Sequence, residues 1–128
     1  MEKFGKPYKL CSRKTIGRLF KEGGQVRAFP LKVYYLESEA DQKTPFQVVL
    51  SAPKRQFKRA HDRNYVKRLL KEILRREKQP LEDFLNEREK QLALMIVYTN
   101  KEIITYPELE KSVRKLVTRL MAELSENT

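Results

Sequence analysis

Residues 53–78 read PKRQFKRAHDRNYVKRLLKEILRREK, with eleven Lys or Arg against three acidic residues. This block supplies a net +8 of the chain's formal +11. On a helix, its apolar residues recur at the spacing of a core-facing stripe: Val66, Leu69, Leu70, Ile73 and Leu74. Its cations and one amide fall on the other side, within an arc of about 100° and over about 21 Å: Asn64, Lys67, Arg68, Lys71, Arg75 and Lys78. The block predicts a helix that is buried on one side and cationic on the other.

A charged helix face often does no more than face water, but this one differs from a typical solvated face. Such faces mix signs, with Glu four residues before Lys, whereas only Glu72 interrupts this row before its last turn. Like charges four residues apart, as at Lys67 and Lys71, repel by about a few tenths of a kcal/mol per pair. A polyanion would turn that repulsion into binding energy. With a pI near 9.8, the composition favours nucleic acid or an anionic membrane as the partner.

Length and patterning predict a single domain. A chain of 128 residues can bury roughly two thirds of its unfolded surface around one core. Its longest apolar run, 92–98, is too short for a membrane span, and the first residues lack the apolar core of a signal peptide. We therefore expect a cytoplasmic protein that is not bound to membranes. The single cysteine, Cys11, fits a reducing compartment and is expected to pack as a small residue.

One helix and two strands are expected before the basic block. Ser12 is a candidate N-cap for a helix of about three turns that Gly23 and Gly24 end. One face of this helix carries Ile16, Leu19 and Phe20. The alternating run 31–36 predicts a strand, and the polar stretch 37–45 a turn. A second strand over 46–50 closes at Pro53, and the basic helix follows directly.

The remainder of the chain predicts one more strand and one more helix. Pro80 should break the basic helix, and 79–91 is expected to form one or two short amphipathic turns. The continuous apolar run 92–99 fits a central strand covered on both sides, although a buried helix has the same pattern. Thr105 and Glu108 form a capping box before a full apolar stripe. The order predicts an α/β (α+β) two-layer sandwich, with a small, mostly antiparallel sheet and about three helices.

The chain offers little for a protein-centred active site. His61 is the only histidine and Cys11 the only cysteine, which excludes zinc sites that need several His or Cys ligands. Asp62 and Glu72 are single acids in a basic field, and we interpret them as a helix-end contact and a salt-bridge partner. No catalytic side chain is predicted, and no metal ligands are assigned.

Three segments resemble the protein subunit of bacterial ribonuclease P: LCSRKTIGRLFKEG at 10–23, FPLKVYYL at 29–36 and AHDRNYVKRLLKE at 60–72. The family's signature helix approximates A-V-x-R-N-R-x-K-R. The matching residues here are Ala60, Arg63, Asn64, Lys67 and Arg68. The chain departs from the pattern in having Tyr65 for the second Arg of the R-N-R triplet and His61 after Ala60, and in having Lys58 where the loop usually has a glycine.

The resemblance implies a ribosomal-protein-like fold with a left-handed βαβ crossover, contrary to the usual right-handed rule. It also implies that an RNA subunit performs the Mg²⁺-dependent removal of the 5′ leader from precursor transfer RNA, with Mg²⁺ bound mainly by RNA and no other protein partner required. The residues implied to contact the RNA subunit are Lys58, Arg59, Arg63, Asn64, Tyr65, Lys67, Arg68, Lys71 and Arg75. A cleft between the sheet and the first helix is implied to receive the leader, at Phe20, Tyr34, Lys54 and Arg55.

The chemistry of unpaired RNA agrees with the leader-binding role that the resemblance implies. An unpaired leader exposes bases that stack on aromatic rings and phosphates that meet Lys and Arg without sequence readout. Tyr34 shares its strand face with Lys32, which favours a surface role, whereas Phe20 could equally pack in the core. Two rival functions remain open at this point: a ribosomal or translation-linked RNA-binding module, and a DNA-binding protein that places the cationic helix in the major groove.

Overall fold

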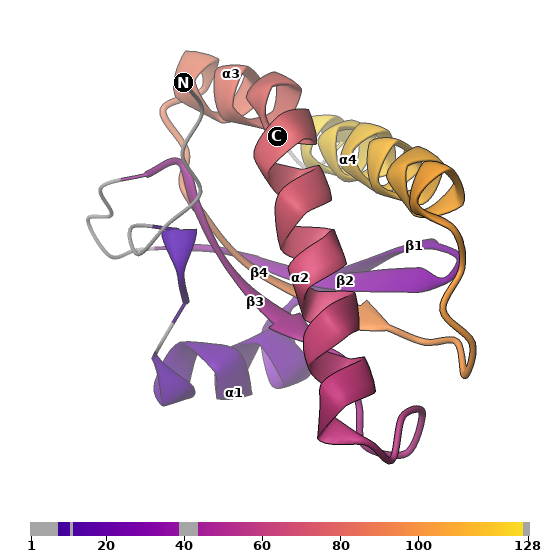
Figure 1. Ribbon diagram of the computed structural model, residues 1–128. Coiled ribbons are helices and arrows are strands. Elements are labelled where there is room, and N and C mark those ends of the chain that lie inside the picture. The colour runs from indigo at the N-terminus through magenta and orange to yellow at the C-terminus, as the bar shows by residue number, and fades with distance from the viewer. Residues whose placement is uncertain (1–7, 11, 39–43, 127–128) are drawn as a thin grey trace.

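A four-stranded sheet lies at the centre of the molecule, in the strand order β1-β2-β4-β3. The computed structural model describes residues 8–10, 12–38 and 44–126. Along the chain the elements are α1 (Arg13–Glu22), β1 (Gly24–Ala28), β2 (Leu31–Glu37), β3 (Phe46–Ser51), α2 (Ala60–Glu77), α3 (Gln79–Glu87), β4 (Leu92–Tyr98) and α4 (Tyr106–Glu126) (Figure 1).

The sheet is mostly antiparallel. β1 and β2 form an antiparallel hairpin, and β2 pairs antiparallel with β4, so that Val33 lies opposite both Val26 and Ile96. β3 and β4 run parallel, with Val48 opposite Leu94. Because parallel neighbours cannot be joined by a tight turn, the chain crosses over through α2 and α3 between them. The mixed α+β class and the βαβ crossover are therefore confirmed.

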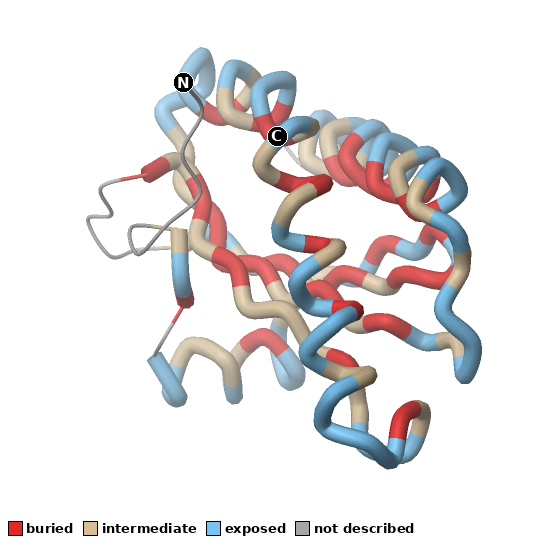
Figure 2. Tube along the Cα trace, viewed as in Figure 1, coloured by how far each residue is buried: buried red, intermediate tan, exposed pale blue. Residues whose placement is uncertain are grey.

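Both faces of the sheet are covered, but unequally. The main core lies between the sheet and the helices α2, α3 and α4, and it includes Val33 and Ile96 from the strands and Val66 from α2. A smaller cluster on the other face contains Leu19 of α1 and Ala93 of β4. Figure 2 shows the buried residues running along the strands between these layers. β4 is thus the doubly covered central strand that its sequence predicts, and α1 adds a partial third layer to the expected two.

The two caps predicted for the first and last helices are present. The Oγ of Ser12 accepts a hydrogen bond from the Thr15 N–H at 3.2 Å. At the start of α4 the Oγ1 of Thr105 accepts from the Glu108 N–H at 3.4 Å. The Glu108 carboxylate accepts from the Thr105 hydroxyl at 2.9 Å. These bonds satisfy backbone donors that the first turn of a helix leaves without partners.

Several expectations need correction. The strand β1 and the separate helix α3 were not predicted, and they raise the totals to four strands and four helices within the described ranges. α2 does not follow β3 directly, because residues 52–59 form a loop between them. Pro80 lies in the first turn of α3, where a missing N–H costs nothing. Cys11 and residues 39–43 of the expected turn lie outside the described residues.

Gly23 and Gly24 connect α1 to β1 by close approach, and not by the left-handed backbone that usually ends a helix. Gly23 has φ −68°, which any residue can adopt. A Cβ on Gly23 would meet the Leu19 carbonyl oxygen and would lie 2.9 Å from the Tyr35 carbonyl oxygen. A Cβ on Gly24 would overlap the Tyr35 ring. The end of α1 therefore sits against β2 with no space for a side chain.

Candidate nucleic-acid interface

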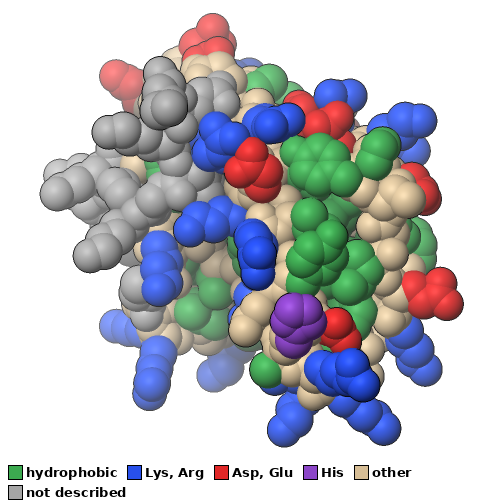
Figure 3. Space-filling view, in the orientation of Figure 1, with side chains coloured by type: hydrophobic (Ala, Val, Ile, Leu, Met, Phe, Trp, Pro, Cys, Tyr) green, Lys and Arg blue, Asp and Glu red, His purple; other side chains and the backbone are tan. Residues whose placement is uncertain are grey.

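The helix α2 has one buried and one exposed side, as predicted. Val66, Leu70 and Ile73 are fully buried. Asn64, Tyr65, Lys67, Arg68 and Lys71 are exposed. Figure 3 shows Lys and Arg side chains along one flank of α2 and around its N-terminal end, and hydrophobic side chains on the flank towards α4. We call Lys67, Arg68 and Lys71 the cationic flank.

The cationic flank is available to a partner. Within the part of the chain that the structure describes, none of its three side chains forms a salt bridge. The row does not continue with free charges into the last turn of α2. There Glu72 binds Arg75 at 2.5 Å and Arg76 at 3.3 Å. These contacts, the hydrogen bond from Arg75 first, hold the pKa of the Glu72 carboxyl below its ordinary value.

Lys78 was predicted to belong to the cationic row, and that prediction is wrong. It is only 5% exposed, and its Nζ binds Glu82 at 2.7 Å. The Tyr8 hydroxyl donates to the same carboxylate at 2.8 Å. Burial lowers the pKa of Lys78, but the hydrogen bond and charge of Glu82 outweigh it, so the pKa lies above the ordinary 10.5. Lys78 therefore joins α2, α3 and the N-terminal segment inside the fold.

The loop before α2 carries four exposed cations, and Arg63 holds it in place. The Nη1 of Arg63 donates to the carbonyl oxygens of Phe57 and Lys58, at 2.9 and 3.0 Å. Phe57 is buried, so both its side chain and its carbonyl oxygen hold the loop near the start of α2. The exposed side chains that it presents are Lys54, Arg55, Lys58 and Arg59. Arg63 was predicted to contact RNA, and the structure gives its guanidinium at least this structural task.

The two aromatic residues predicted for the leader cleft lie together where α1 meets β2. The rings of Phe20 and Tyr34 have centroids 5.1 Å apart and are tilted by 57°. The Nζ of Lys32 lies over the Tyr34 ring at 4.8 Å from its centroid. Phe20 is 54% exposed, so it does not pack in the core. We call Phe20, Lys32 and Tyr34 the α1–β2 surface.

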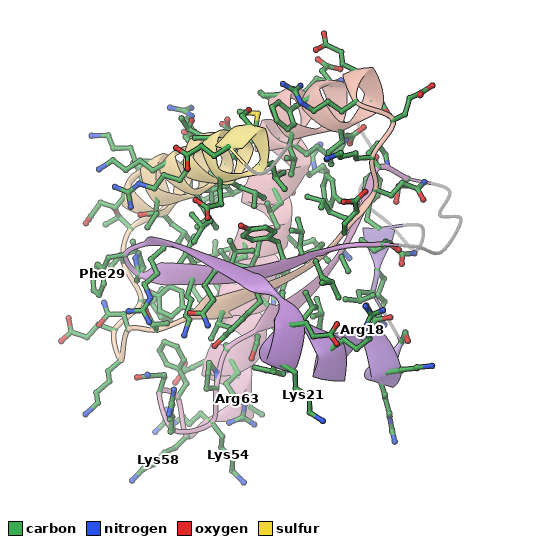
Figure 4. All side chains as sticks on the ribbon, turned by 180° about the vertical axis from the view of Figure 1, so that it is seen from behind. Arg18, Lys21, Phe29, Lys54, Lys58 and Arg63 are labelled. Atoms are coloured by element: carbon green, nitrogen blue, oxygen red, sulfur yellow. The ribbon has the colours of Figure 1, made fainter. Side chains whose placement is uncertain are left out.

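The strand register extends this surface into a row across the sheet. Lys32 is paired with Arg27 of β1 and with Val97 of β4, and Val97 is paired with Ser51 at the end of β3. Since paired residues share a face, the row leads from β1 towards the loop that begins after Ser51. Lys54, Lys58, Arg63 and, from α1, Lys21 all lie at this end of the molecule (Figure 4).

Sequence reasoning did not select Arg27, Lys32 or Lys21 as site residues. A signal was present for Lys32, because it lies two residues before Tyr34 on the same strand and therefore on the same face. No such signal existed for Arg27, whose strand was not predicted. Lys21 lies in the last turn of α1, where a basic residue also suits the helix dipole.

Searches for two other kinds of site gave no candidate within the described ranges. Residues 8–10, 12–38 and 44–126 contain no group of three or more His, Cys, Asp or Glu side chains that could hold a metal ion. None of the helices seen there is both long and apolar enough to cross a membrane.

The sequence and the fold are both similar to known proteins. Residues 4–121 match the family described as Ribonuclease P. The ribonuclease P protein component of Porphyromonas gingivalis strain ATCC 33277 is 30% identical over 115 residues, which cover 90% of this chain and 84% of the relative. The same component of strain W83 matches equally.

Two solved structures share the fold. The RNase P protein of Staphylococcus aureus superimposes with a TM-score of 0.70 at 18% identity, covering 90% of this chain and 96% of that one. The RNase P protein of Thermotoga maritima gives a TM-score of 0.66 at 19% identity, covering 87% and 96%. Since the family match spans nearly the whole chain and includes the segments that carry the cationic flank and the α1–β2 surface, the chain belongs to the ribonuclease P protein family.

Proposed function

We propose that this chain is the protein subunit of a ribonuclease P particle and that it binds two RNA molecules through two surfaces. The cationic flank of α2, with the loop before it, binds the catalytic RNA subunit. The α1–β2 surface binds the 5′ leader of precursor transfer RNA. The particle is an endoribonuclease that removes this leader, and it is expected to work in the cytoplasm.

The exposed cationic flank is the observation that carries the proposal. Lys67 and Lys71 lie one turn apart on α2 without acidic partners in the described parts of the chain. Cations spaced along a rod suit the phosphates of a folded RNA, and each neutralised phosphate releases counterions. The same neutralisation lowers the Mg²⁺ concentration that two RNAs need in order to approach each other. Tyr65 is 42% exposed beside this flank, where an aromatic ring can stack on an unpaired base.

On the α1–β2 surface the chemistry allows general recognition of a leader. The Phe20 and Tyr34 rings can stack on bases of any identity, at about 1–3 kcal/mol per base. Lys32 supplies a positive charge beside the rings without reading base edges. The chain would thus bind and orient the substrate, while the RNA subunit and its Mg²⁺ ions supply the hydrolysis. Such a surface suits a subunit that must accept many different leaders.

Reconstitution with a bacterial ribonuclease P RNA tests the proposal. At low Mg²⁺, adding the protein should restore cleavage of a precursor transfer RNA at the 5′ end of the mature sequence. Tyr34→Ala should weaken binding of a precursor with a long leader by about tenfold, since one stacking contact is lost, and should leave leaderless transfer RNA unaffected. Tyr34→Phe keeps the ring and serves as the control. A ribosomal RNA-binding module would bind RNA without stimulating cleavage, and that result would refute the proposal.

A further inference from the structure

The most exposed large hydrophobic side chain described lies outside both surfaces. Phe29 is 73% exposed, although its neighbours in the hairpin, Ala28 and Leu31, are buried. It occupies the two-residue turn between β1 and β2. Figure 4 shows it at the outer end of that hairpin. Burying a Phe side chain is worth about 1.5–3 kcal/mol, so the fold leaves this stabilisation unused.

The backbone that carries Phe29 is held from several sides, so the exposure is not that of a loose loop. The Ser112 hydroxyl of α4 donates to the Phe29 carbonyl oxygen at 2.8 Å. The N–H and the hydroxyl of Thr99 both donate to the Pro30 carbonyl oxygen, each at 2.8 Å. Arg119 donates to the Arg27 carbonyl oxygen. The turn is therefore a fixed platform, and none of these bonds depends on the Phe29 ring.

The position of Phe29 continues the row of the α1–β2 surface. Along β1, exposed Gln25 and Arg27 alternate with buried Val26 and Ala28, and Phe29 continues the exposed set. Arg27 lies directly opposite Lys32, and like charges in that position repel. Neither forms a salt bridge within the described part of the chain. A phosphate between them would relieve the repulsion.

We propose that Phe29 is a second stacking platform for the leader, beyond the one at Tyr34, with Arg27 and Lys32 binding a phosphate of the leader segment that lies between the two rings. This inference rests on the proposed function. Three residue steps along β2 lead from Leu31, next to the turn, to Tyr34, which is roughly 10 Å at 3.3 Å per residue. That length matches about three stacked nucleotides at a rise of 3.4 Å each, or fewer in a stretched strand. Phe29 would then contact a nucleotide farther from the cleavage site than Tyr34 does.

Graded leader lengths test this arrangement. The reconstituted particle is titrated with precursors whose leaders increase from one to about ten nucleotides, using wild type, Phe29→Leu and Tyr34→Ala. Phe29→Leu keeps an apolar side chain and every hydrogen bond of the turn, but removes the ring. We expect it to bind short leaders like wild type and to lose about tenfold in affinity once the leader passes a threshold length, as expected for one stacked base. Phe29→Trp should retain the affinity.

The controls separate this inference from the proposed function. Tyr34→Ala should lose affinity at a shorter leader length than Phe29→Leu. Ile103→Ala, at another exposed apolar residue (37%), should match wild type throughout. If the affinity loss of Tyr34→Ala depends on leader length and that of Phe29→Leu does not, the inference about Phe29 is wrong and the proposed function stands. If Phe29→Leu weakens all precursors equally, its ring contacts the transfer RNA body or the RNA subunit, and the inference is overturned. If the affinity of neither variant changes with leader length relative to wild type, both the inference about Phe29 and the proposed function are wrong.

Discussion

The middle turns of α2 contribute three cations, and so does its C-terminal end, where the C-cap Lys78 follows Arg75 and Arg76, but the fold uses the two sets differently. Lys67, Arg68 and Lys71 are exposed and form no salt bridge in the described chain. Arg75 and Arg76 share the carboxylate of Glu72, and Lys78 is buried against Glu82. The difference shows that the density of charge along a helix does not predict which charges a partner can reach. The pairs that actually form decide that, since Glu72 lies four residues from both Arg68 and Arg76 but binds Arg75 and Arg76.

The largest effect should come from Lys78. Lys78→Ala leaves Glu82 largely buried without its cation, and breaking a buried pair in this way costs about 3–5 kcal/mol. We expect the free energy of unfolding, measured in urea, to fall by about 3 kcal/mol. Lys78→Met, which retains the aliphatic stem, should lose less of the free energy of unfolding. The fraction of Lys78→Ala that remains folded should bind the RNA subunit with unchanged affinity. Weaker binding would mean that Lys78 contacts the RNA after all.

Stability at alkaline pH checks the same cluster. The pKa of Lys78 lies above its ordinary 10.5. Burial first, and then the hydrogen bond to Glu82, raises the pKa of Tyr8 above its ordinary 10.0. A raised pKa in the folded state means that the contribution to stability is complete below the ordinary pKa and is lost as the pH rises through the folded value. Wild type should therefore lose stability above about pH 10, and Lys78→Met should lose less over the same range.

The second effect is on RNA affinity. Arg68→Ala combined with Lys71→Ala removes two charge-assisted contacts of about 1.5 kcal/mol each, which together correspond to about a hundredfold weaker binding of the RNA subunit. Thermal unfolding should barely change, because both side chains are exposed. The matched double variant, Arg75→Ala with Arg76→Ala, should lose less than tenfold. If the two double variants lose affinity for the RNA subunit equally, the middle and the end of α2 do not differ in RNA binding.

A smaller effect on stability is expected at Arg63, which lies between the loop and the cationic flank. Arg63→Ala removes the hydrogen bonds to the carbonyl oxygens of Phe57 and Lys58, at a cost of about 1.5 kcal/mol for a charged donor. Arg63→Lys should recover part of it. Hydrogen exchange of the amides in residues 54–59 should accelerate in the Ala variant. If exchange there is unchanged, the loop is held by other contacts.

The smallest effect tests Glu72 directly. For wild type binding to the RNA subunit, about five neutralised phosphates give a slope of about −3.5 to −4.5 in a plot of log affinity against log salt. Glu72→Gln removes the carboxylate that holds Arg75 and Arg76, so the slope should become steeper by about 0.7–0.9 for each guanidinium that reaches a phosphate. A slope that stays at the wild-type value would mean that the last turn of α2 does not face the RNA.

Elements with a strong period or a clear boundary could be predicted from the sequence. The continuous apolar run of β4 indicated a strand buried on both faces, and the apolar stripe of α4 began at the cap that Thr105 provides. β1 was missed because it is five residues long and begins one residue after α1 ends. Only Val26 and Ala28 mark its buried face. α3 was missed because Pro80 stops one helix and lies in the first turn of the next.

The interface was less predictable than the fold, because exposure and pairing depend on tertiary contacts. Phe20 and Ile16 look alike in the sequence, yet the structure exposes Phe20 against Tyr34. By helical periodicity, Lys78 falls on the same side of the helix as the other cations of the predicted row. Glu82, four residues later, was the available sign that it would be paired. Phe29 is part of the segment 29–36 that carries the family resemblance, but no local pattern in the sequence reveals that the hairpin leaves its ring in solvent.

The absence of side chains at Gly23 and Gly24 bears on the geometry of the proposed leader-binding surface. They set the clearance between the end of α1 and β2, and Phe20 is three residues before Gly23 on the same rigid helix. A methyl group added at position 23 would meet the Leu19 carbonyl oxygen and lie 2.9 Å from the Tyr35 carbonyl oxygen, so the end of α1 would have to move away from β2, and Phe20 would move with it relative to Tyr34. In the proposed function, the spacing of the two rings that stack on the leader would therefore depend on a residue at the helix end that does not itself touch the nucleotide.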